Sequence, residues 1–163
     1  MIKKNKEKKI CFICSSGGHF SELKKMSLIA EKYDSFLVTE KTKNFNTNFV
    51  KKIYFVKEIN RKEVFFVFSF FWLVVKEIFI FLKEKPNYII TTGALIAYPI
   101  ARFAKMIGTK IVYIESFARV YDLSLTGKKF YKFSDIFFVQ WKDLAIKYPK
   151  AIFVGNLFEV DIK

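Results

Sequence analysis

The sequence SSGGHFSEL, residues 15–23, determines how the rest of the chain is interpreted. It follows the apolar run 10–14 and leads into helical spacing of apolar residues, which predicts a strand, a glycine turn and a helix start. Gly17 and Gly18 let a ligand approach the main chain, and the free N–H groups of a helix start favour phosphate. His19 is the only histidine of the chain, and imidazole is the commonest general base toward a hydroxyl. The turn therefore predicts a phosphate site beside a base.

The chain has 163 residues, a formal charge of +14 and 52% hydrophobic residues. This length suits one domain, and no Pro- or Ser-rich linker divides it, so we predict a single domain over residues 1–163. The positive charge favours an anionic partner such as a membrane surface or a phosphorylated substrate. Nucleic acid is disfavoured, because the aromatic residues lie in core-like strands rather than in a nucleic-acid motif.

Strand-like and helix-like segments alternate along the whole chain. Predicted strands span 10–14, 35–39, 52–56, 88–92, 110–115, 135–139 and 151–154, and predicted helices span 20–32, 64–82 and 95–107, with a polar loop at 41–48. This alternation predicts an α/β fold, namely a single Rossmann-like lobe with a mostly parallel sheet. In such a sheet the ligand lies beyond the carboxyl ends of the strands.

Three groups of candidate site residues follow predicted strands and should therefore meet at one edge of the sheet. They are Ser15, Ser16, Gly17, Gly18 and His19, then Thr92 and Gly93, and finally Glu115, Ser116 and Arg119. Arg119 suits a diphosphate through paired hydrogen bonds, or it neutralises Glu115 in an ion pair. For His19, the alternative to a base is a side chain that only caps or packs at the turn.

Cofactor and metal motifs are missing from the sequence. It has no G-x-G-x-x-G after the first strand and no G-x-x-x-x-G-K-[ST], which disfavours a dinucleotide cofactor and a nucleotide triphosphatase. No cluster of His, Cys and carboxylates has metal-ligand spacing, so we predict neither a cofactor nor a metal. Cys11 and Cys14 point to opposite faces of a strand, which predicts buried thiols rather than a redox pair.

Residues 64–82 are apolar except for Ser69, Lys76 and Glu77. A helix of this length measures about 28 Å and reaches across a bilayer core. The strands on either side of it belong to one predicted sheet, however, which argues against a crossing. Because a sheet covers only one side of a helix, the other side is predicted to contact a membrane or a partner. The predicted contacts are Phe65, Phe68, Trp72 and Phe79, and the basic flanks Arg61, Lys62, Lys83 and Lys85 suit anionic headgroups.

The alternative for residues 64–82 is a fully buried crossover helix.

The basic start of the chain is followed by a short strand rather than by an apolar signal segment. We therefore predict a peripheral protein on the cytoplasmic face of the plasma membrane.

Four motifs in order carry a family resemblance: SSGGHFSEL, IITTGALIAYP, YIESFARV with DLSLTGK, and DIFFVQW. They resemble the small bacterial capsule and exopolysaccharide proteins of the PssD type. Those are similar to the membrane-side subunit of the split N-acetylglucosaminyltransferase that acts on dolichol-linked sugars. More distantly, the glycine-glycine-histidine turn resembles the acceptor lobe of the MurG glycosyltransferase. The resemblance runs from about Ile10 to Phe158.

The resemblance implies one half of a GT-B glycosyltransferase, a lobe that binds a polyprenyl-diphosphate-linked sugar and docks on the membrane. A donor-binding partner subunit would hold the UDP-sugar, in agreement with a chain that ends soon after its last predicted strand. His19 would take the proton of the acceptor hydroxyl, and Glu115 would orient His19 or hold the acceptor sugar. The other site residues would bind the acceptor and its phosphates.

Two other functions compete with an acceptor-presenting subunit of capsule or exopolysaccharide biosynthesis. One is a non-catalytic membrane anchor that activates a catalytic partner. The other is a soluble nucleotide-binding enzyme of the same fold.

Overall fold

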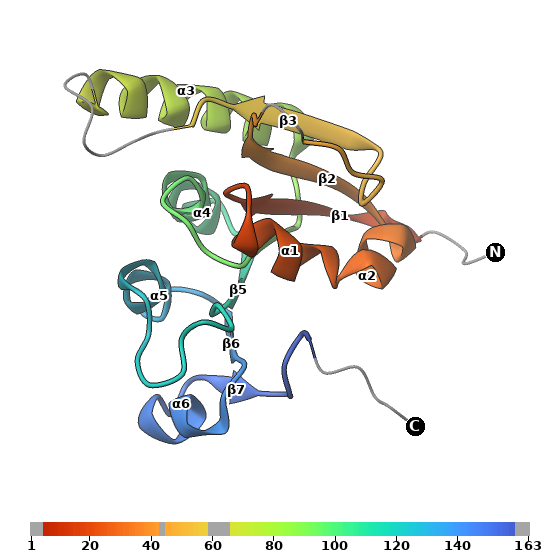
Figure 1. Ribbon diagram of the computed structural model, residues 1–163. Coiled ribbons are helices and arrows are strands. Elements are labelled where there is room, and N and C mark those ends of the chain that lie inside the picture. The colour runs from red at the N-terminus through yellow and green to blue at the C-terminus, as the bar shows by residue number, and fades with distance from the viewer. Residues whose placement is uncertain (1–4, 43–44, 59–65, 159–163) are drawn as a thin grey trace.

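The computed structural model describes residues 5–42, 45–58 and 66–158, which form one parallel sheet flanked by helices (Figure 1). The strands are β1 (Asn5–Cys14), β2 (Tyr33–Glu40), β3 (Lys52–Val56), β4 (Tyr88–Thr91), β5 (Lys110–Ile114), β6 (Ile136–Val139) and β7 (Ile152–Phe153). The helices are α1 (Gly18–Lys24), α2 (Ser27–Lys32), α3 (Phe66–Glu84), α4 (Ala97–Met106), α5 (Leu125–Phe130) and α6 (Lys142–Lys147). The predicted α/β class is confirmed.

The seven strands lie in the order β3-β2-β1-β4-β5-β6-β7, and every neighbouring pair is parallel. The chain runs outward from β1 to β3, returns through α3 to β4, and then continues in the other direction. Strand order therefore reverses between β1 and β4, where an open parallel sheet leaves a crevice for a ligand. The prediction of a mostly parallel sheet is confirmed, and the sheet is parallel throughout the described residues.

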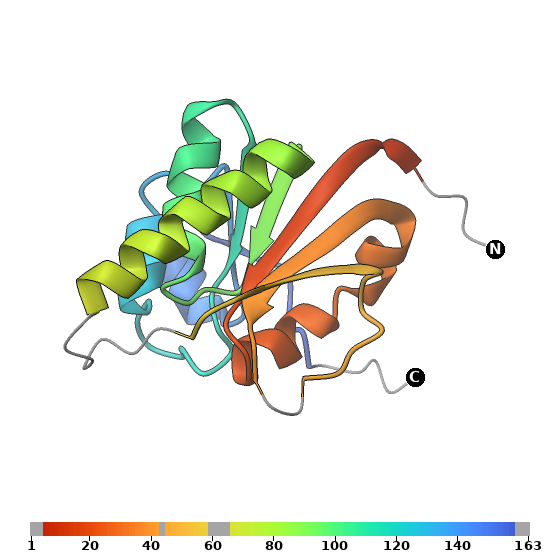
Figure 2. The ribbon, with the colours of Figure 1, turned by 90° about the horizontal axis from the view of Figure 1, so that it is seen from above.

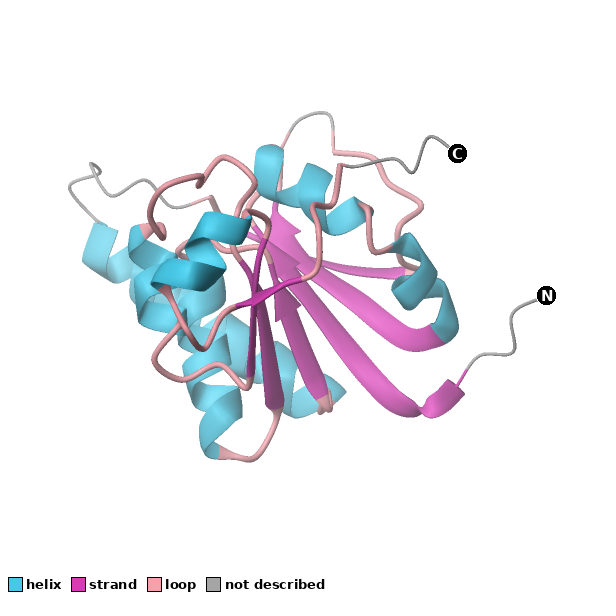
Figure 3. Ribbon diagram, turned by 90° about the horizontal axis from the view of Figure 1, so that it is seen from below, coloured by secondary structure: helices cyan, strands magenta, loops and turns pink. Residues whose placement is uncertain are grey.

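Helices cover both faces of the sheet (Figures 1 and 3). Residues of α3, α4, α5 and α6 pack on the face that carries Cys11 and Ile13, whereas α1 and α2 pack on the face that carries Phe12 and Cys14. Successive side chains of a strand point to opposite faces, which separates the two thiols as predicted. Both cysteines are buried and free.

The predicted helix 20–32 is two short helices in the structure. Lys25 N–H donates to the carbonyl of Glu22 at 3.1 Å, and Met26 N–H donates to that of Leu23 at 3.0 Å. These tight bonds end α1 after seven residues, so its dipole is smaller than that of the long helix we predicted. Helix α5 was not predicted, because its six residues are too few to show a period.

Helix α3 has one covered and one uncovered side (Figure 2). Its buried residues are Leu73, Glu77, Ile80, Phe81 and Glu84. Its large apolar residues in contact with solvent are Val67, Phe68, Phe71, Trp72, Val75, Phe79 and Leu82, between 40% and 79% exposed. The fully buried alternative is therefore wrong, since a sheet and α4 can cover only part of the helix surface. Phe65 and the flanks Arg61 and Lys62 lie outside the described residues. No described helix meets the length and apolarity that a membrane crossing requires.

Candidate functional site

The glycine turn after β1 is open to solvent. Gly17 has φ of 87°, a left-handed conformation that favours glycine, and Ser21 N–H donates to its carbonyl at 3.0 Å. Apart from the adjoining backbone, no atom of the described residues lies within 4 Å of the place where a Cβ on Gly17 or Gly18 would stand. Ser15 and Ser16 are half-buried at the entry to the turn. The main chain of this turn is accordingly accessible to a ligand.

The turn after β4 holds the turn after β1 in place. The buried hydroxyl of Thr92 donates to the backbone carbonyl of His19 at 2.8 Å. Gly93 lies against the His19 ring, because a Cβ at Gly93 would stand 3.4 Å from Cε1 of His19 and 3.1 Å from the hydroxyl of Tyr113. Gly93 also has φ of 111°. Thr92 and Gly93 therefore support His19, and their predicted contact with an acceptor stays a prediction.

The His19 imidazole is suited to act as a base near neutral pH. Burial lowers its pKa below the ordinary value, and the nearby Arg119 guanidinium acts in the same direction, whereas contacts with the backbone of Thr92 and the charge of Glu115 oppose the shift. The ring is therefore neutral at pH 7. Nδ1 is buried and has no hydrogen-bond partner among the described residues, which leaves Nε2 as the nitrogen available to a ligand.

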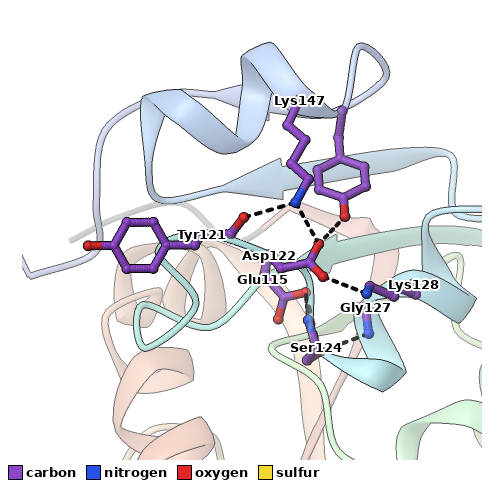
Figure 4. A network of polar contacts seen from close by, with 8 residues as sticks. Glu115, Tyr121, Asp122, Ser124, Gly127, Lys128 and Lys147 are labelled. Atoms are coloured by element: carbon purple, nitrogen blue, oxygen red, sulfur yellow. Dashed lines mark hydrogen bonds and ion pairs between the residues drawn. The ribbon is translucent and has the colours of Figure 1, made fainter.

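Glu115 is fully buried and its carboxylate is engaged by neighbouring donors (Figure 4). It accepts hydrogen bonds from Ser116 N–H at 3.0 Å, from Ser124 N–H at 3.0 Å, from the Ser124 hydroxyl at 3.2 Å and from the Tyr113 hydroxyl at 3.4 Å. Burial raises its pKa and these donors oppose the rise. The carboxylate thus organises the loop that follows β5 and reaches His19 only through its charge.

Gly127 makes room for this carboxylate. A Cβ at Gly127 would stand 1.8 Å from Oε2 of Glu115, and the Gly127 N–H donates to the Ser124 hydroxyl at 2.8 Å as the cap of α5. The same end of the site contains Asp122, which accepts from Lys128 at 2.6 Å, from Lys147 at 3.3 Å and from Tyr148. Helix α5 therefore begins in a dense polar network.

Arg119 is exposed and forms no ion pair within the part of the chain that the structure describes. The Glu115–Arg119 ion pair weighed above is thus not formed. Arg119 N–H donates to the carbonyl of Ser116 at 2.9 Å in a tight turn. Its guanidinium is near enough to His19 to lower the pKa of that ring and is available to an anion.

Sequence reasoning missed four residues of this site: Glu22, Tyr113, Ser124 and Gly127. All four stand inside the quoted motifs SSGGHFSEL, YIESFARV and DLSLTGK, which by themselves assign no role to them. Their importance depends on contacts between distant segments, so residue type and spacing do not reveal it. Within the described residues, no three potential metal-ligating side chains lie together.

The sheet order and the ligand edge between β1 and β4 define the class of protein as a single Rossmann-like lobe of the GT-B type. Acinetobacter baumannii MurG has this fold, with a TM-score of 0.70 and 11% identity, over 91% of this chain and 46% of that chain. A UDP-N-acetylglucosamine 2-epimerase is similar, with a TM-score of 0.68 and 10% identity, over 93% of this chain and 49% of that chain. The chain spans about half the length of these two structures.

The family model described as "Oligosaccharide biosynthesis protein Alg14 like" matches residues 1–157, and the chain belongs to this family. The UDP-N-acetylglucosamine transferase subunit ALG14 of Mus musculus is 26% identical over 179 aligned positions, which cover 91% of this chain and 82% of that protein. ALG14 of Homo sapiens is 27% identical with the same coverage. ALG14 of Yarrowia lipolytica is 43% identical, but over 46% of this chain and 38% of that protein.

The predicted resemblance to a transferase subunit with a MurG-like fold is confirmed by these similarities. They do not support the bacterial capsule assignment, because the relatives are named as UDP-N-acetylglucosamine transferase subunits.

Proposed function

We propose that this chain is the acceptor-binding subunit of a two-component glycosyltransferase. A partner subunit would bind the donor, which we take to be UDP-N-acetylglucosamine from the names of the relatives. The acceptor would be a polyprenyl-diphosphate-linked sugar. The capsule context stays a prediction from the sequence and is not part of this proposal.

The observation that carries the proposal is the presence of a neutral, half-buried His19 and of Arg119, which forms no ion pair with any residue that the structure describes, at the ligand edge of the sheet. An exposed guanidinium without an ion pair suits a diphosphate, and the open main chain at Gly17 and Gly18 adds N–H donors. A neutral imidazole beside that anion site suits proton removal from a sugar hydroxyl.

The proposed reaction needs both subunits. Nε2 of His19 takes the proton of the acceptor hydroxyl while that oxygen bonds to the anomeric carbon of the donor sugar. The bond between the anomeric carbon and the UDP oxygen breaks, and UDP leaves from the partner. Because burial, together with Arg119, holds the pKa of His19 below its ordinary value, the neutral base form persists to a lower pH than that of a free imidazole.

The exposed apolar side of α3 supports peripheral attachment to a membrane, where a lipid-linked acceptor resides. Phe68, Trp72 and Phe79 are 55% to 68% exposed, and Lys83 and Lys85 lie exposed at the end of the helix. Aromatic side chains with flanking lysines are typical of helices in the membrane interface. We propose peripheral attachment to a membrane on this ground, and the cytoplasmic face stays a prediction from the sequence.

The same helix favours a second candidate function, a membrane anchor that activates a catalytic partner without contributing a base. Under this function the exposed side of α3 is essential and His19 is not. One assay separates the two functions.

The test measures transfer from a panel of radiolabelled UDP-sugars, including UDP-N-acetylglucosamine, to a polyprenyl-diphosphate-linked sugar. Membranes would contain this chain, the product of its neighbouring gene as the candidate partner, or both. We expect transfer only with both chains, and we expect His19→Ala to lower it by 10²-fold or more, the usual size of a general-base effect. Full transfer by the His19→Ala variant together with the partner would leave only the anchor function.

A second assay tests the membrane contact with vesicles that contain anionic phospholipid. Replacing Phe68, Trp72 and Phe79 by serine should release the chain from the vesicles. Leu28→Ser is the matched control, because Leu28 is 70% exposed on α2, which packs on the other face of the sheet from α3. Equal release by both variants would contradict a specific contact through α3.

A further inference from the structure

A buried glutamate outside the proposed chemistry joins two of the turns that form the site. Glu22 lies on α1, three residues after His19, and is 4% exposed. Its Oε1 accepts hydrogen bonds from the Ser116 hydroxyl at 2.8 Å and from Phe117 N–H at 3.0 Å. One carboxyl oxygen therefore attaches the loop after β5 to the helix that begins at the glycine turn.

Two further contacts orient this loop. The Phe117 carbonyl accepts a hydrogen bond from the indole N–H of Trp141 at 2.7 Å, and the two rings lie 4.9 Å apart. Arg119 N–H donates to the carbonyl of Ser116, so Arg119 follows Ser116 by one tight turn. The place of Arg119 consequently depends on where Ser116 is held.

Only one of the two carboxyl oxygens of Glu22 accepts hydrogen bonds from described residues. Its Oε2 is buried and has no hydrogen-bond partner, while Oε1 takes both donors from the loop. A buried carboxyl with an unpaired oxygen is costly, and an apolar side chain would fill the same space at lower cost. The distinct contribution of the carboxyl is therefore the attachment of the loop.

We propose that Glu22 is a positioning residue that holds the loop after β5 against α1 and thereby keeps Arg119 at the same edge of the site as the His19 imidazole. The inference rests on the proposed function for the roles of His19 and Arg119. The placement itself is a property of the folded chain and can be measured without a partner or a substrate.

The experiment uses the single histidine of the chain as a reporter. Its imidazole signals can be followed by NMR through a pH titration without ambiguity, since His19 is the only histidine. Burial and Arg119 both lower the pKa of His19, whereas Glu115, which raises it, stays held by Ser124 at the start of α5. A loop released by Glu22→Ala should therefore raise that pKa. Loss of the Glu22 negative charge alone acts in the opposite direction, so the sign separates the two effects.

Glu22→Gln is the critical comparison. It makes the same change of charge as Glu22→Ala but keeps an oxygen that accepts from Ser116 and Phe117, so the pKa of His19 should not rise. Glu31→Ala, on the exposed side of α2, should leave the pKa unchanged. Ser116→Ala removes one of the two donors, should give an intermediate rise, and serves if Glu22→Ala does not fold.

A pKa of His19 that does not rise in Glu22→Ala and Ser116→Ala, or that rises equally in Glu22→Gln, would overturn the inference. The transfer assay tests the proposed function independently of the His19 titrations. If the wild-type pair transfers no sugar while the titrations follow the expected order, the proposed function is wrong and the role of Glu22 stands. If transfer requires His19 but the titrations show no rise in the pKa of His19, the proposed function stands and the role of Glu22 is wrong.

Discussion

The hydroxyl of Thr92 donates a 2.8 Å hydrogen bond to the backbone carbonyl of His19, and this bond joins two turns that are 73 positions apart in the chain. Thr92 is fully buried, so the Thr92 hydroxyl is a hydrogen-bond partner of the His19 carbonyl in a place that water does not reach. The orientation of the candidate base therefore depends in part on Thr92, whose hydroxyl holds the His19 main chain.

Thr92→Val should destabilise the protein and also disturb His19. Valine keeps the shape of threonine but leaves the His19 carbonyl without its donor, which costs about 1–3 kcal/mol in the free energy of unfolding. Urea unfolding measures that loss, and NMR of the His19 imidazole measures the disturbance.

Thr109→Val is the matched control for Thr92→Val. The Thr109 hydroxyl also donates to a buried carbonyl, that of Pro86 at 3.1 Å, but just before β5, at the amino edge of the sheet. Thr109→Val should lower the free energy of unfolding without changing the NMR signals of His19. Equal His19 signals in the two variants would contradict a specific role for Thr92.

Gly93→Ala should be poorly tolerated, because Gly93 has φ of 111° and its Cβ would crowd the Tyr113 hydroxyl and the His19 ring. We expect a loss of about 1–3 kcal/mol in the free energy of unfolding from the strained backbone alone. Gly18→Ala is the control, since Gly18 begins α1 with open space around it and alanine favours a helix. Urea midpoints that fall equally in both variants would refute this explanation.

Gly127→Ala should act through the Glu115 carboxylate, from which the new Cβ would stand only 1.8 Å. The measurement is a double-mutant cycle of unfolding free energies with Glu115→Ala. Once the carboxylate is removed, Gly127→Ala should cost much less, with a coupling energy of about 1–3 kcal/mol. Additive costs would show that the two residues act independently.

Glu84 should give the protein an acid-sensitive stability. Burial acts to raise its pKa, but hydrogen bonds from Lys52, Tyr54 and Lys9 outweigh it and lower the pKa to about 2. A carboxyl with a lowered pKa stabilises the fold above its unfolded pKa, near 4.5, and this contribution disappears as the pH falls toward about 2.

Glu84→Gln tests this contribution through unfolding free energies measured between pH 6 and pH 2. The variant should be less stable than the wild type by about 2 kcal/mol near neutral pH, and the difference should vanish at the acidic end. Glu31→Gln, at an exposed position of α2, should show no such trend. A constant difference between the Glu84→Gln variant and the wild type at all pH values would contradict the assignment.

Much of the fold could be predicted because its elements are long enough to show a period. Strand 52–56 matches β3, and the apolar helix predicted from residue 64 begins within the described residues at Phe66. The break between α1 and α2 was missed, because Lys25 and Met26 are not helix-breaking residues and the turn is stabilised by tertiary packing. Helix α5 was missed because six residues show no period.

The candidate site could be predicted as an edge of the sheet but not as a set of contacts. The order of strands and turns brought His19, Gly93 and Glu115 to one side. It did not reveal that the Thr92 hydroxyl supports His19, nor that the Glu115 carboxylate is enclosed by the start of α5. Each of those contacts depends on distances between side chains from different elements.

The parallel α/β class, the glycine turn with its single histidine, and the apolar length of α3 follow from the amino-acid sequence alone, because each depends on neighbouring residues and their period. The side of α3 that stays uncovered and the partners of the buried carboxyls depend on how the elements pack in three dimensions. The bonds of Glu22 join residues 94 and 95 positions apart. Such contacts form only once the folded sheet has aligned the strand ends from which these turns emerge.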